Sequence, residues 1–245
     1  MKYSIWISII VILLAAGVST AAEKTLTPEK ILQLADQYRA GWGSFSLWVR
    51  ITNYKRDRLE EESQYEVYVR TTKSYVKFLN PRDKGRSLLM LEDDMWIYIP
   101  STSRPIRISP MQRLSGNVSN GDVARTNYAG DYAAVLLKED SIDGRDCYLL
   151  ELTAKRKGAT YPKIQYWISK SDYTPRKAEF FLTSGKNHKT ALYDSFQDFQ
   201  GRHLLARMTI VDKIRREEKS VMEYLRYAPR EIPDKYFNKN SMATN

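Results

Sequence analysis

The chain has 245 residues, and its 39 lysine and arginine residues outnumber its 29 aspartate and glutamate residues, giving a formal net charge of +10. A chain of this length fits one all-β domain, since such domains can run to about 250 residues. A single cysteine, Cys147, excludes an internal disulfide, so the fold must be stabilised by its hydrophobic core. Cys147 lies in an apolar run, which predicts a buried small side chain.

The positive charge has three interpretations: nucleic acid binding, attraction to an anionic membrane surface, or plain solubility. Lysine and arginine are spread along the chain, and the densest basic group, Lys213–Arg216, is followed at once by two glutamates, as is typical of a solvated turn. Transient contact with anionic lipid headgroups or an acidic partner stays open. Nucleic acid is disfavoured because the N-terminus predicts export.

Residues 1–22 have the layout of a secretory signal peptide. Lys2 provides a positive start, Ile5–Leu14 is apolar, and small residues precede a cleavage expected after Ala21 or Ala22. The apolar stretch is shorter than the roughly 20 residues of a membrane span, although an uncleaved anchor is the alternative. We therefore predict that residues 23–245 form a single domain in the periplasm of a Gram-negative bacterium.

One long helix is predicted over Thr27–Ala40. Thr27 can cap it, Pro28 suits the first helical position, and Gly41 follows its end. The apolar residues at helical spacing are Ile31, Leu34, Ala35 and Tyr38.

From Phe45 onward the apolar period changes to two, which indicates half-buried antiparallel strands. The predicted strands are residues 45–52, 65–70, 75–78, 85–91, 95–99, 135–142, 147–154, 163–169, 176–183, 190–199, 204–212 and 220–227. Asp143-Gly144 marks a tight turn between two of them. Ile232–Phe237 predicts a closing turn of helix.

A sheet of about eleven strands twists, so it must curl, close or split into two layers. We expect a mainly β fold in which a curled, half-open antiparallel barrel is partly covered by the helix. Uncovered apolar surface of that size marks a binding site. The alternative is a two-layer sandwich that fills its own core. The alternating apolar residues predicted to line a lipid cavity are Leu47, Val49, Val67, Val69, Phe78, Ile97, Leu150, Ile168, Phe180 and Met208, with ordinary core packing as the competing interpretation of each.

The segment Pro110–Asp131 has few large apolar residues and several turn formers, which predicts an ordered but mobile connection over the open side or edge of the sheet. A simple crossover loop is the alternative interpretation. Just before it, Arg104 and Arg107 lie in a proline-punctuated stretch. These two arginines are candidates for holding a headgroup at the cavity rim, or they belong to a solvated loop.

The sequence contains none of the common catalytic motifs. Its two histidines, His188 and His203, belong to no zinc-binding pattern, and no glycine-rich phosphate loop or nucleophile elbow occurs. The carboxylates show no spacing that selects a catalytic pair. We predict a protein that is not an enzyme and that uses no metal and no cofactor.

Several short patterns resemble one family. Trp96, Tyr98 and Pro100 end a strand, Arg104 and Arg107 follow, and a Gly/Ser/Asn-Asp loop comes next at 116–122. Further matching positions are Trp167, Pro175 and the final IPDKYF. Together they resemble the outer membrane lipoprotein-sorting proteins of the LolA-like superfamily, over most of the chain after the signal peptide.

The resemblance implies a half-open barrel with a lid of helices over a hydrophobic cavity. It also implies a periplasmic carrier of lipid or lipoprotein acyl chains, or a sensor of them, in some members associated with inner-membrane transporters of the resistance-nodulation-division class. Two hypotheses follow: a carrier that binds acyl chains without catalysis, and an interaction module that binds a periplasmic domain or a membrane transporter.

Overall fold

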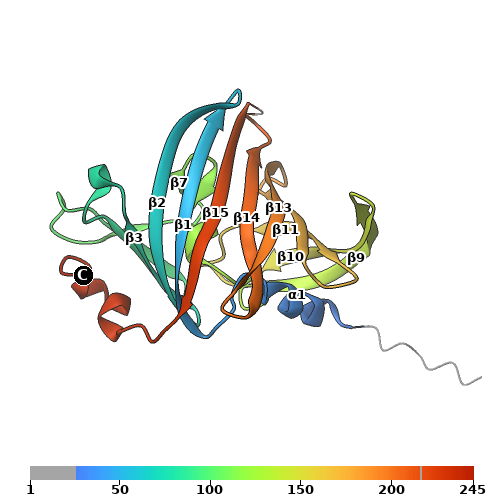
Figure 1. Ribbon diagram of the computed structural model, residues 1–245, viewed down its shortest axis with the longest axis horizontal. Helices are drawn as coiled ribbons and strands as arrows, with labels where there is room; N and C mark the ends of the chain where they lie inside the picture. Colours follow the sequence, from blue (N-terminus) through green and yellow to red (C-terminus); the bar gives the residue numbers. More distant parts are fainter. Residues whose placement is uncertain (1–25, 216) are drawn as a thin grey trace, which may run out of the picture.

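The computed structural model describes residues 26–215 and 217–245, which form one curved sheet with a few short helices (Figure 1). The predicted signal peptide lies outside the described residues. The sheet has 13 strands, listed in chain order: β1 (Ser44–Lys55), β2 (Arg58–Arg70), β3 (Lys73–Phe78), β4 (Ser87–Leu91), β5 (Asp94–Tyr98), β6 (Ile106–Ile108), β9 (Tyr132–Ile142), β10 (Arg145–Ala154), β11 (Lys163–Ser169), β12 (Pro175–Phe181), β13 (Asn187–Phe199), β14 (Arg202–Asp212) and β15 (Glu218–Pro229).

The strand order joins two meanders at their long strands. It runs β6-β5-β4-β3-β2-β1-β15-β14-β13-β12-β11-β10-β9, with every neighbouring pair antiparallel. The first and last strands, β1 and β15, pair in the middle, and β6 and β9 form the two edges. The large antiparallel sheet agrees with the predicted mainly β fold. The sheet has one strand more than the twelve predicted ranges, because β6 has only three residues and its pattern is too short to recognise.

The chain between β6 and β9 therefore has to join the two opposite edges of the sheet. Along the sheet these edges are roughly 55–60 Å apart at about 4.8 Å per strand. Residues 110–131, which we call the connecting segment, contain folded elements and so span much less than an extended chain. These elements are β7 (Arg113–Ser115), β8 (Val118–Ser119) and the short helix α2 (Asn120–Ala124). The short connection requires the sheet to curl until its edges approach each other.

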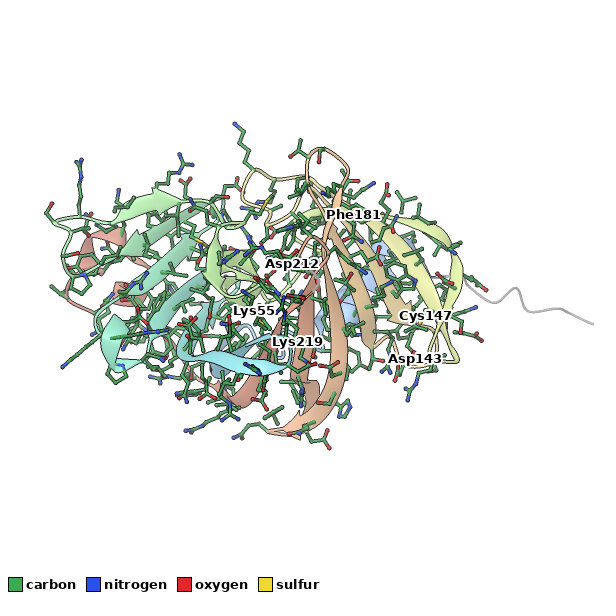
Figure 2. All side chains as sticks on the ribbon, turned by 90° about the horizontal axis from the view of Figure 1, so that it is seen from above. Lys55, Asp143, Cys147, Phe181, Asp212 and Lys219 are labelled. Atoms are coloured by element: carbon green, nitrogen blue, oxygen red, sulfur yellow. The ribbon has the colours of Figure 1, made fainter. Side chains whose placement is uncertain are left out.

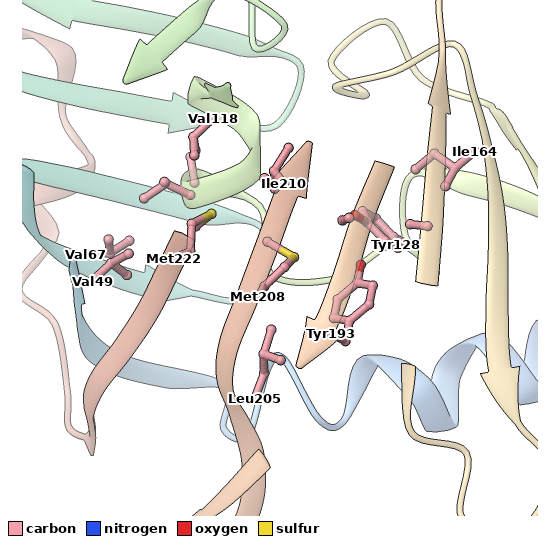
Figure 3. Packing of buried hydrophobic residues seen from close by; sticks show 14 of the residues in the cluster. Val49, Val67, Val118, Tyr128, Ile164, Tyr193, Leu205, Met208, Ile210 and Met222 are labelled. Atoms are coloured by element: carbon pink, nitrogen blue, oxygen red, sulfur yellow. The ribbon is translucent and has the colours of Figure 1, made fainter. Parts of the chain in front are cut away.

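The connecting segment lies inside the curl. In Figure 1 it is the green ribbon behind β1 and β2, and α2 contacts β2 and β3. Val118, Val123 and Tyr128 belong to the main hydrophobic cluster, and Figure 3 shows Val118 beside Met222 and Ile210 of the sheet. The prediction that this segment covers the open side of the sheet is confirmed, and the segment also fills much of the interior.

The alternation predicted for the strands is confirmed. On β1, Phe45, Leu47, Val49 and Ile51 are all buried on the concave face. Cys147 is buried and free, as predicted. A second, smaller cluster on the other face contains Tyr68 and Tyr75, covered by the C-terminal turn η2 (Asp234–Phe237). That turn confirms the closing helical turn predicted for Ile232–Phe237.

The predicted helix Thr27–Ala40 is too long. The helix α1 covers only Pro28–Asp36, with Thr27 as its cap. Beyond Asp36 the backbone tightens, with Arg39 N–H bonding to the carbonyl of Asp36 at 3.0 Å. The chain leaves the helix here because the carbonyl of Tyr38 accepts a hydrogen bond from Leu205 N–H on β14, at 2.8 Å. Tertiary contacts thus end the helix before the glycines do.

The β1–β15 pair joins the two halves of the sheet, which we call its arms, and side chains connect these arms again where the β4–β5 turn comes close to the β10–β11 loop. Arg125, at the end of α2, donates to the carbonyl of Glu92 in the β4–β5 turn and to that of Gly158 in the β10–β11 loop. Its guanidinium also lies 2.7 Å from Asp131, just before β9. Arg156 bonds Asp93 of the β4–β5 turn at 2.9 Å. We call this group the clasp.

Candidate ligand-binding site

The predicted cavity residues lie on the concave face, and most of them form the core. Eight of the ten are at most 3 % exposed, and Phe78 is 9 % exposed, while Ile97 is half-buried. Leu47, Val49 and Val67 pack with α1 and the connecting segment in the main cluster. Within the described residues, the connecting segment thus covers much of the apolar concave surface that we expected to be uncovered. Whether any of these side chains contacts a ligand stays a prediction.

A hollow of about 270 Å³, which we call the edge hollow, lies where β3, β5 and β6 meet the connecting segment. Phe78 and Ile97, both predicted cavity residues, line it together with Ile108 and Leu114. Its polar lining includes Arg86, whose guanidinium stacks over the Phe78 ring at 4.9 Å. Two of the predicted lining residues therefore border open space here.

A larger hollow of about 500 Å³ lies at the N-terminal end of β1, where the chain passes from α1 into the sheet. Trp42, Phe45 and Val69 supply its apolar lining, and Thr126 and Asn127 of the connecting segment form part of its wall. The connecting segment is therefore bordered by open space at both of its ends.

A third hollow, of about 190 Å³, adjoins the edge hollow at Arg113, and we call it the basic hollow. His188 and Lys189 from β13, Asp212 from β14 and Arg215 from the following turn line it. Asp212 lies near the middle of the molecule in Figure 2, beside Lys55 and Lys219. Although burial opposes the shift, the backbone amides of Arg215 and Ile214 lower the pKa of Asp212.

Lys189 is buried in a polar network beneath this hollow. Its amine donates to the Ser119 hydroxyl at 2.7 Å and lies 3.8 Å from the carboxylate of Asp122. That carboxylate accepts hydrogen bonds from Tyr161 O–H at 2.9 Å and from Ser119 N–H at 2.8 Å. Burial lowers the pKa of Lys189, with Asp122 acting in the opposite direction. The network fixes α2 to β13 and, through Tyr161, to the loop that leads into β11.

A second buried polar group pins α1 to the connecting segment. The Asp36 carboxylate accepts hydrogen bonds from the amides of Tyr128 at 2.8 Å and Ala129 at 2.7 Å. The buried Arg39 guanidinium lies 4.2 Å from the centre of the Tyr128 ring. Burial raises the pKa of Asp36 to about 6, although Ala129 N–H and Arg39 act in the opposite direction.

The two predicted rim arginines do not line these hollows. Arg104 and Arg107 are both exposed, and Arg107 forms an ion pair with Asp94 across the β5–β6 pair. Neither lies beside the edge hollow or the basic hollow. Sequence reasoning missed Arg113, because a lone arginine in a turn-rich segment carries no signal until the fold brings β13 and the β14–β15 turn beside it.

Among the residues that the structure describes, no three histidine, cysteine, aspartate or glutamate side chains are grouped so as to hold a metal ion. No helix in the described ranges is long and apolar enough to cross a membrane. The hollows are lined mainly by apolar and basic side chains.

Comparison with known proteins decides the family. The chain is 38% identical to a LolA superfamily protein from Nitrosomonas europaea, whose crystal structure it matches with a TM-score of 0.83 over 88% of this chain and 99% of that one. The chain belongs to the LolA superfamily. A family model described as "Uncharacterized protein" also matches residues 70–244 of this LolA superfamily member. Comparison with curated proteins finds no match.

Two more solved structures share the fold of this LolA superfamily protein. One is a DUF1329 family protein from Desulfovibrio piger, with 20% identity and a TM-score of 0.73 over 89% of this chain and 100% of that one. The other is a putative outer membrane lipoprotein-sorting protein domain from Vibrio parahaemolyticus, with 20% identity and a TM-score of 0.73 over 88% and 98%. The resemblance inferred from the strand-end and loop motifs is confirmed.

Proposed function

We propose that this protein carries the acyl chain of a lipid or lipoprotein across the periplasm, between the inner and outer membranes, without catalysing a reaction. One observation carries the proposal: a concave, apolar face of a 13-stranded sheet is covered by a connection of short helical and strand pieces instead of by a second large sheet. The family supports it, since the fold is shared with proteins described as lipoprotein-sorting.

In this proposal the acyl chain enters at the edge hollow and lies against β1 and β2, in the place now taken by Val118 and Val123. Burial of apolar surface contributes about 25 cal/mol per Å², so a bound acyl chain gains several kcal/mol. That gain offsets the release of residues 118–124 from the sheet, while Asn117 stays bound to β15. The contacts of Lys189 with Ser119 and Asp122 are polar and local, and they re-form when these residues return.

We also propose that the protein is located in the periplasm and that an inner-membrane transporter is its partner. N-terminal sequencing of the exported protein tests the location: the chain is expected to begin after Ala21 or Ala22. An interaction module that binds only protein is the alternative function.

The proposal predicts uptake of a single acyl chain. Purified protein is incubated with radiolabelled lysophosphatidylcholine below its micelle concentration, and bound label is separated by gel filtration. We expect stoichiometric uptake by the native chain and loss of most uptake in Ile97→Trp, because the indole fills the edge hollow.

The matched control is Leu192→Trp, since Leu192 is an exposed apolar residue in the centre of β13. This variant is expected to bind like the native protein. Equal uptake by the two variants would place the acyl chain elsewhere. If the native protein takes up no label and its organic extract contains no lipid by mass spectrometry, the carrier function is wrong and the interaction module is favoured.

A further inference from the structure

Arg113 lies between two hollows of different chemistry. On one side the edge hollow offers Phe78, Ile97 and Leu114, and on the other the basic hollow offers His188, Lys189 and Arg215. We propose that the basic hollow binds the phosphate of an anionic headgroup whose acyl chain enters the edge hollow. The inference rests on the proposed function and adds the class of ligand: an anionic amphiphile.

The charges around the basic hollow leave one cation without a partner. Lys189 faces Asp122 at 3.8 Å, and Arg215 lies 3.3 Å from Glu218 and 3.9 Å from Asp212. Arg113 forms no ion pair with any of the described residues. Its charge also lowers the pKa of Lys189, adding to the effect of burial, so the two cations repel each other. A bound anion would relieve that repulsion.

His188 supplies a second unused group. Its Nδ1 is buried and has no hydrogen-bond partner among the described residues. A buried polar atom without a partner is costly, and a phosphate oxygen beside it would satisfy it. Burial lowers the pKa of His188, and Lys189 lowers it further, so the ring is neutral at pH 7 and binds through a hydrogen bond instead of through charge.

The wall that carries Arg113 is firmly held. Asn117, in the β7–β8 turn, donates its backbone N–H to the Ser220 hydroxyl at 2.8 Å and its side-chain amide to the Glu218 carbonyl at 2.9 Å. Gly116 packs so closely that a Cβ there would lie 1.9 Å from Asn53 Oδ1. The hollow of about 190 Å³ far exceeds the roughly 10–15 Å³ that one water needs, so it has room for a group larger than a water molecule.

The experiment compares two lipids that share one acyl chain. Binding of lysophosphatidylglycerol, which carries one anionic phosphate, and of a monoacylglycerol, which carries no phosphate and no charge, is measured on the native chain, on Arg113→Gln and on a control, Arg145→Gln. Arg145 is exposed in the β9–β10 turn, between Asp143 and Cys147 at the far end of the molecule in Figure 2. Inorganic phosphate is titrated separately.

We expect the native chain to bind the anionic lipid about tenfold more tightly than the uncharged one, as one charge-assisted hydrogen-bond pair provides. Arg113→Gln should remove that preference and leave monoacylglycerol binding within about twofold, whereas Arg145→Gln should keep it. Because Arg113 is exposed, the variant is expected to fold.

Three results would overturn the inference, and each differs from a failure of the carrier function. Equal binding of both lipids to the native chain would show that the headgroup is not read. A preference that survives Arg113→Gln would place the anion elsewhere. Phosphate that binds the native chain tightly, without any preference between the lipids, would make the ligand a free anion. The carrier function itself fails only if neither lipid binds.

Discussion

Asp36 shows how a single buried group can make the stability of this fold depend on pH. Its carboxylate is 6 % exposed and holds the connecting segment through two backbone amides. Because burial raises its pKa from 3.8 to about 6, the folded state binds the proton more tightly than the unfolded chain does. The stability gained from neutral Asp36 is therefore fully present below about pH 4 and is lost as the pH rises through about 6.

We predict that Asp36→Asn becomes more stable relative to the native chain as the pH is raised from 4 to 7, by up to roughly 3 kcal/mol. Asparagine keeps an oxygen acceptor for the amides of the connecting segment but never ionises. Urea unfolding at several pH values measures the difference. The exposed Asp143→Asn serves as control and should show no such trend. A difference that is flat between pH 4 and 7 would contradict the account.

For individual residues, sequence reasoning predicted the burial of apolar side chains correctly and missed the burial of polar ones. Alternation on β1 predicts which side chains are buried, because a strand has only two faces and the choice is local. No local rule marks Lys189, Arg125 or Asp131 as buried, since their partners come from segments far away in the chain. For the same reason no sequence pattern marks Arg113 as lining a hollow, and a role for Arg104 and Arg107 in binding a headgroup stays a prediction.

Among the elements, the clasp determines how the two arms of the sheet meet. Arg125 and Asp131 have side chains that are only 7% and 3% exposed, and their charges lie 2.7 Å apart. Burial lowers the pKa of Arg125 and raises that of Asp131, so each charge depends on the other. Arg156 is a weaker second partner for Asp131, at 3.6 Å.

Removal of one partner of the clasp should therefore be much worse than removal of both. We predict that Arg125→Met destabilises the fold by about 3–5 kcal/mol, because a buried carboxylate is left nearly unpaired. The double variant Arg125→Met with Asp131→Leu should regain about 1–3 kcal/mol of that loss in a double-mutant cycle. The exposed pair Arg56–Glu217 is the control, with an expected coupling below about 1 kcal/mol. Equal couplings in the two cycles would show that the clasp is only a surface contact.

The element boundaries that sequence reasoning missed have a common cause. The helix α1 ends early because the carbonyl of Tyr38 accepts a hydrogen bond from β14, and the first half of β2 shows no alternation because Leu59 is its only apolar residue before Tyr65. Its strand conformation depends on pairing with β1. The connecting segment was recognised as a covering element, but its short strands and helix were not, since none is long enough to show a period.

For the whole molecule, the order of the strands explains the covered interior. With β1 and β15 paired in the middle, the chain has to return from one edge of the sheet to the other across the concave face. The sequence predicts a curled sheet and leaves open whether the interior is filled. The structure shows that residues 110–131 fill it, so a carrier of this construction has to exchange part of its own chain for its cargo.

Hydrogen exchange over residues 110–131, with and without bound lysophosphatidylcholine, tests this exchange most directly. The account predicts faster exchange of the amides of 118–124 in the complex, while those of β1 and β2 remain protected. Unchanged exchange of 118–124 with lipid fully bound would contradict it, because the acyl chain would then occupy a place that the connecting segment never filled.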